Sequence, residues 1–113
     1  TVPDPPTAFN KISPVDGDKA VAMIPVLQWE SSTDVSIYEY CYDTTDNDDC
    51  SDWIQHDPST TVQLSGLEPG TSYYWQVRTE NISGTTYADG SESSFWVFRT
   101  SQLIYLPVIL CGD

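Results

Sequence analysis

Apolar and polar residues alternate along several short segments of the chain, and clusters of Gly, Pro, Asp and Ser separate these segments. A period of two residues is typical of β-strands, and no stretch has the apolar spacing of an amphipathic helix. Short strands at such spacing, joined by turn-forming residues, predict an all-β fold, a seven-stranded antiparallel β-sandwich. The expected strands are residues 8–12, 25–30, 37–42, 53–56, 60–64, 73–79 and 95–100.

The alternation also assigns faces within two of these segments. In residues 73–79 the side chains of Tyr73, Trp75 and Val77 form an apolar face, which predicts a central strand. In residues 37–42 the three tyrosines share one face, and we expect the opposite face, which carries Glu39, to be exposed to water. The predicted core consists of Trp29, Tyr38, Tyr40, Tyr73, Trp75, Val77 and Phe98.

Length and charge limit the function classes. A chain of 113 residues suits one domain, and we divide it into an extended N-terminal segment (1–7), the sandwich (8–101) and an apolar tail (102–113). Four Lys and Arg residues against 17 Asp and Glu residues give a net charge of -13. This charge repels phosphate backbones and anionic lipids, so we expect no nucleic-acid partner, and no segment is long enough to span a membrane.

The three cysteines point to an oxidising compartment. Cys41 and Cys50 suit one local disulfide better than a zinc site, because the chain has neither a CxxC pair nor a second histidine. A disulfide predicts an extracellular location. Cys111 is then left over, as a free thiol or as an intermolecular bridge.

One stretch resembles a known family. Leu67, Pro69, Thr71 and Tyr73 recur at alternate positions before the longest strand, which resembles the fibronectin type III pattern. The resemblance covers roughly residues 9–100 and implies an immunoglobulin-like sandwich. It also implies that the hydroxyl of Tyr73 bonds back to the backbone a few residues upstream, as a tyrosine corner, and that Trp29 is buried.

A narrower likeness concerns residues 38–45, Cys50, 73–78 and 85–90, which resemble fibronectin type III repeats of bacterial secreted and cell-surface proteins. Such repeats are spacers or adhesive modules. The likeness therefore implies a location outside the cell or on the bacterial surface. It supplies no binding motif, since residues 81–94 contain no Arg-Gly-Asp, and the fold alone fixes no function.

Residues that carry chemistry are few. His56 is the single histidine, and the chain has no nucleophile elbow, phosphate loop or Cys-His dyad, so we expect no enzyme and no cofactor. One acidic loop offers oxygen ligands for Ca²⁺, although it does not follow the EF-hand order, and the alternative is a solvated loop. The weak Ca²⁺ candidates are Asp46, Asp48, Asp49 and Asp52.

Two surface features are candidates for binding or modification. Asn81 begins the sequon Asn81-Ile82-Ser83 and is a candidate for glycosylation. An aromatic and polar outer face offers a surface that stacks on sugars or binds a protein, but ordinary cross-strand pairing explains the same residues and is favoured. This face comprises Glu39, Trp53, Tyr74, Gln76 and Arg78.

The tail is unusual for so acidic a protein, because residues 103–111 carry no charge. Burial of each large apolar side chain is worth about 1.5–3 kcal/mol, so the tail is driven to find a partner. Three fates remain open: packing on its own domain, addition as a strand to a neighbouring subunit, and service as a sorting signal. The assembly residues are Leu103, Ile104, Tyr105, Leu106, Val108, Ile109 and Leu110.

These observations predict a non-catalytic extracellular structural or adhesive building block that assembles with copies of itself, through its termini, into a surface filament or array. Other surface proteins and glycans are the alternative partners. The alternative functions are a carbohydrate- or protein-binding accessory module and a passive spacer of a larger surface protein.

Overall fold

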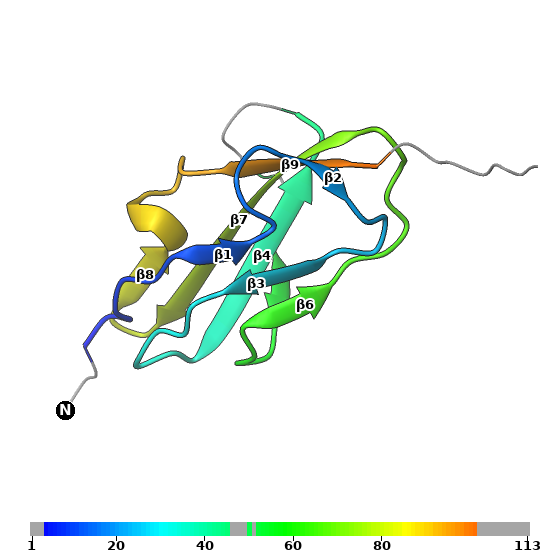
Figure 1. The fold of residues 1–113 in the computed structure, drawn as a ribbon. Coiled ribbons are helices and arrows are strands. Elements are labelled where there is room, and N and C mark those ends of the chain that lie inside the picture. Colours follow the sequence, from blue (N-terminus) through cyan, green and yellow to red (C-terminus); the bar gives the residue numbers. More distant parts are fainter. Residues whose placement is uncertain (1–3, 46–49, 51, 102–113) are drawn as a thin grey trace, which may run out of the picture.

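Two β-sheets pack face to face in a computed structural model that describes residues 4–45, 50 and 52–101 (Figure 1). The smaller sheet has the strand order β1-β3-β6, with β1 at Lys11–Ser13, β3 at Val26–Trp29 and β6 at Thr61–Gln63. Its strands pair antiparallel. Leu27 and Trp29 point inward from β3 and are buried, while Val26 and Gln28 point outward.

The larger sheet has the order β2-β9-β7-β4-β5, with β8 also paired to β7. Its two longest strands, β4 and β7, lie next to each other inside the sheet and are hydrogen-bonded on both sides. The strands are β2 (Asp18–Val21), β4 (Ile37–Asp43), β5 (Ile54–His56), β7 (Ser72–Asn81), β8 (Gly84–Tyr87) and β9 (Trp96–Thr100).

The first strand of the sandwich changes sheets partway along. β1 pairs with β3 in the smaller sheet, and β2 pairs with β9 in the larger one. Between them Gly17 adopts a positive φ of 89°, a conformation that residues with a Cβ rarely adopt. The Gly17 N–H donates to the carbonyl of Val97 at 2.8 Å, which fixes the crossing. The β2–β9 pairing is parallel, so the expectation of a wholly antiparallel sandwich is wrong at this one pair.

The last strand is interrupted in the middle. Trp75 and Arg78, three residues apart on β7, pair with Trp96 and Tyr87, which are nine residues apart. The additional residues form the 3-10 turn η1 (Ala88–Gly90) and the loop that leads to β9. β8 and β9 are thus two halves of one strand position beside β7, separated by a bulge.

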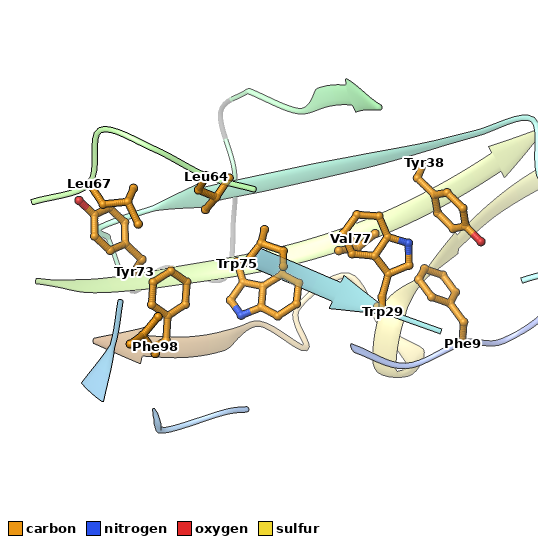
Figure 2. Packing of buried hydrophobic residues seen from close by; sticks show 12 residues of the cluster. Phe9, Trp29, Tyr38, Leu64, Leu67, Tyr73, Trp75, Val77 and Phe98 are labelled. Atoms are coloured by element: carbon orange, nitrogen blue, oxygen red, sulfur yellow. The ribbon is translucent and has the colours of Figure 1, made fainter. Parts of the chain in front are cut away.

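The core lies between the sheets and contains every predicted core residue except Tyr40, which is partly buried and packs against it (Figure 2). Tyr38 meets the rings of Phe9 and Trp29 edge-on, at centroid distances of 5.8 and 5.6 Å. The fully buried large side chains include Trp29, Tyr38, Trp75, Val77 and Phe98.

Two tyrosine hydroxyls anchor chain reversals at the border of the core. The hydroxyl of Tyr73 accepts a hydrogen bond from the N–H of Glu68 at 2.8 Å, which confirms the tyrosine corner. The hydroxyl of Tyr38 accepts in the same way from the N–H of Ser32 at 2.9 Å. In each case a buried ring carries a polar atom that satisfies a loop N–H group.

All seven predicted strands are present, with ends that differ by at most three residues. β2 and β8 were not predicted. Residues 18–21 and 84–87 do not alternate apolar with polar residues, so the pattern predicts no strand at either place. Both strands exist because of their partners, β9 and β7.

Candidate functional site

The outer face of the larger sheet is the best candidate surface, and it is covered rather than open. Glu39 is only 8% exposed, so the expectation that its face is wet is wrong. The Arg78 Nε donates to Glu39 Oε1 at 2.7 Å, and the guanidinium lies 4.2 Å from the ring centroid of Trp53. Tyr87 packs edge-on against Trp53, with ring centroids 6.1 Å apart.

The side chains of this cluster form their hydrogen bonds and ring contacts with one another. Burial disfavours the charge on Arg78, but the hydrogen bonds and charges of Glu39 and Tyr87 outweigh it and raise the pKa of Arg78 above its ordinary value. The arginine therefore stays charged, and its hydrogen-bonding and stacking capacity is directed to its neighbours. Cross-strand pairing of Glu39 with Arg78 accounts for both residues.

Gln76 belongs to the same face and is completely buried. Its Nε2 donates to the carbonyl of Ser91 at 3.0 Å, with longer contacts to the carbonyls of Ala88 and Ser94 at 3.4 and 3.3 Å. Its Oε1 accepts from the N–H of Val77 at 2.9 Å. One amide thus holds the bulge between β8 and β9 against the sheet. Tyr74, the remaining member of the predicted face, is half-buried.

The predicted disulfide is present. Cys41, on β4, is joined to Cys50, with Cα atoms 6.2 Å apart, and the Cys41 side chain is buried. Closing this short loop restricts the unfolded chain and is worth about 2–3 kcal/mol. Cys111 lies outside the described residues, as do the assembly residues of the tail.

The acidic loop gives no evidence of a cation site in its described part. Asp46, Asp48 and Asp49 lie outside the described residues, and Asp52 is exposed. Asp52 lines a shallow pocket with Tyr42, Asp43 and Cys50. Among the described residues no group of three or more His, Cys, Asp or Glu side chains is arranged to hold a metal ion. Ca²⁺ binding stays a prediction.

Asn81 and His56 both have structural contacts. The Asn81 Nδ2 donates at 2.7 Å to the carbonyls of Asp4 and Asp34, so it joins the N-terminal segment to the end of β7. A glycan on this nitrogen would compete with those two bonds, and glycosylation stays a prediction. The His56 Nε2 lies 2.8 Å from the carbonyl of Thr61, and the imidazole ring packs edge-on against Trp29.

A buried ion pair is the feature that the sequence patterns do not indicate. Lys11 lies within the expected strand 8–12, and nothing in the alternation connects it to Asp89. The structure brings Lys11 Nζ to 2.5 Å from Asp89 Oδ2, with the Lys11 side chain fully buried. No spacing signal exists for the pair, since 77 residues separate the two in the chain.

Within the part of the chain that the structure describes, no helix is long and apolar enough to span a membrane.

The arrangement of sheets, the tyrosine corner and the buried Trp29 together define a fibronectin type III-like sandwich. A solved structure of a fibronectin type III domain called FN3tt has the same fold, with a TM-score of 0.50, 21% identity, and coverage of 90% of this chain and 98% of that one. A mutant of FN3tt superposes with a TM-score of 0.49 at 20% identity, covering 89% and 97%. No family model and no curated protein matches the chain.

Proposed function

We propose that the protein is a non-catalytic extracellular building block of a bacterial cell surface, which assembles end to end with copies of itself through its termini. The observation that carries the proposal is the position of the two ends of the described chain, which leave the sandwich at opposite poles (Figure 1). Asp4 is bonded to Asn81, the last residue of β7, and Ser101 is bonded to Gly70, just before β7 begins. β7 has ten residues, so the poles are about 30 Å apart.

Termini at opposite poles suit a module that is linked end to end with other modules. A chain that enters at one pole and leaves at the other adds its whole length to an array, and its neighbours need no contact with its faces. The disulfide supports an extracellular location, because such bonds persist where the environment is oxidising. The uncharged tail sequence, residues 103–111, supports assembly, since it follows directly from the pole at Ser101.

The sheet edges limit how a second copy attaches. On β6 the Thr61 carbonyl accepts hydrogen bonds from the His56 ring and from the Ser59 hydroxyl. The Thr61 N–H donates to the Ser59 hydroxyl oxygen. Asp18 accepts from the N–H of Ala20 on β2. Side chains that occupy edge groups oppose the addition of a further strand.

The other edge of the larger sheet, β5, is exposed at Ile54 and Gln55 and is the acceptor that we propose for a neighbour's tail. Addition of an extended segment to this edge would continue the sheet across the subunit boundary. Each copy would then donate one tail and accept another, a heterologous contact that forms a filament when the rotation does not close a ring.

The assembly state of two chains tests the proposal. Light scattering and negative-stain microscopy at neutral pH compare the full chain with a chain that ends at Ser101, both carrying Cys111→Ser where the residue is present. We expect polymers of the full chain and monomers of the shortened one. Monomers in both preparations would refute assembly through the tail and would favour the passive spacer.

A further inference from the structure

Lys11 and Asp89 form a buried contact between the beginning and the end of the sandwich. Lys11 lies on β1, and Asp89 lies in η1, within the bulge that interrupts the last strand. Their Nζ and Oδ2 atoms are 2.5 Å apart, and the side chains are 0% and 18% exposed. A buried charge pair must offset the loss of hydration on both ions, so it contributes less to stability than its short distance implies.

The surroundings of the amine are mostly aromatic. The Lys11 Nζ lies 5.7 Å from the ring centroid of Trp75 and 5.1 Å from that of Trp96. It also donates to the carbonyl of Ser94 at 2.7 Å. Burial lowers the pKa of Lys11, although the hydrogen bond to Asp89 and the charges of Asp89 and Asp16 oppose this shift. Desolvation in an apolar pocket is one way in which a lysine becomes a nucleophile.

The carboxyl group is held in place by its own backbone. Asp89 has a φ of 60° and Gly90 a φ of 92°, so two consecutive residues in the left-handed region turn the chain toward β1. The Asp89 N–H donates to the carbonyl of Phe9 at 3.0 Å. The bonds from Gln76 hold the rest of the bulge. Groups fixed in contact react with a large effective concentration, because little motion remains to be lost.

We propose that Lys11 and Asp89 are joined by an intramolecular amide bond between Nζ and Cγ. One proton first passes from the ammonium to the carboxylate, which gives a neutral amine beside a neutral acid. The lone pair of Nζ then attacks Cγ, one bond beyond Oδ2. The bond from Cγ to one carboxyl oxygen breaks, and that oxygen leaves as water with two of the three ammonium protons. The third proton stays on the new amide, within reach of the Ser94 carbonyl. The step needs no oxidant and no cofactor.

The bond would connect the first strand to the last strand position covalently, at the level of the bulge. It does not depend on the proposed assembly, because it lies inside one chain. The bond would also explain why the last strand is interrupted, because the bulge places Asp89 against Lys11.

Mass spectrometry of the full chain tests the proposal. The folded protein is denatured, reduced and alkylated, and its intact mass is compared with the mass calculated for the sequence with all three cysteines alkylated. We expect the mass to be lower by one water molecule. Trypsin should fail to cleave after Lys11 and should release a branched peptide in which residues 1–19 are joined to residues 79–99.

One competing reaction has the same mass change. The dipeptides Asp16-Gly17 and Asp89-Gly90 can each lose water by cyclising on their own backbone, without Lys11. Lys11→Met and Asp89→Ala separate the two reactions, because the amide bond needs both side chains whereas cyclisation needs only the aspartate. We expect both variants to have the full mass of their sequences. The peptide map of the unaltered chain decides the question even where a variant does not fold.

Two results would overturn the proposal. One is a full mass, with normal cleavage after Lys11, in a chain that circular dichroism shows to be folded. The other is a loss of water that persists in Lys11→Met.

Discussion

The outer faces of the two sheets differ sharply. On the larger sheet, outward side chains such as Gln76, Glu39 and Cys41 are buried under further segments of the same chain. On the smaller sheet, the outward residues of all three strands are exposed and uncharged: Ile12, Val26, Gln28, Thr61 and Gln63. Both faces belong to one sandwich, and both alternate in sequence. The difference teaches that alternation identifies the inner face of a strand but does not show whether the outer face meets water.

The difference also bears on function. On the covered outer face Arg78 is paired with Glu39 and stacked on Trp53, whereas Tyr74 is half-buried, and sugar binding around Tyr74 stays a prediction. The outward strand residues of the smaller sheet are uncharged and exposed.

A substitution in the core, between the two sheets, is expected to cause the largest loss of stability. Trp75 is fully buried, and Trp75→Ala should lower the free energy of unfolding by about 3–5 kcal/mol, because it leaves a large cavity. Urea denaturation measures the change. Trp53→Ala, on the covered outer face, is the matched control and should cost about 1 kcal/mol through loss of its contact with Arg78. Equal losses at the two tryptophans would mean that the outer layer is as tightly packed as the core.

The disulfide should have the next largest effect. The double variant Cys41→Ala and Cys50→Ala should lose about 2–3 kcal/mol, because the chain between the two cysteines is no longer closed into a loop. The midpoint of thermal unfolding, with and without a reducing agent, checks this result. The reducing agent should destabilise the unaltered chain and leave the double variant unchanged. An unchanged midpoint for the unaltered chain under reducing conditions would contradict the assignment.

Substitution of one glutamine on each outer face compares the contribution of the two faces to stability. Gln76→Ala should cost about 1–3 kcal/mol, because it leaves buried carbonyls of the bulge without a donor. Gln28→Ala, on the exposed face, should change stability by less than about 0.5 kcal/mol. Chemical denaturation of both variants gives the difference. Similar values for the two would show that the bulge does not depend on the Gln76 amide.

The smallest effect is expected on the exposed outer face of the smaller sheet. Val26 is 46% exposed, so Val26→Thr should change the free energy of unfolding by no more than about 0.5 kcal/mol. Val77→Thr introduces the same hydroxyl into the core and should cost about 1–3 kcal/mol. A large loss at Val26 would indicate that something covers this face in solution, and sedimentation velocity would then show an associated species.

The sequence predicted what depends on local pattern. The seven strands, the buried tryptophans and the disulfide follow from alternation, aromatic content and spacing, and the tyrosine corner follows from a short motif. The burial of Glu39 was missed because it is paired with Arg78, which stacks on Trp53, and these three residues come from separate segments of the chain. The contact of Lys11 with Asp89 was missed for the same reason, since only the bulge in the last strand position brings them together.

The exchange of side-chain amide protons, followed by nuclear magnetic resonance, tests most directly whether one face of this module is an interior layer. The account predicts that the Nε2 protons of Gln76 exchange with water far more slowly than those of Gln28, because the Gln76 amide is buried and donates to backbone carbonyls. Equally fast exchange at both glutamines would contradict it. The outer face of the larger sheet would then be open, and a ligand-binding role around Tyr74 would become the better account.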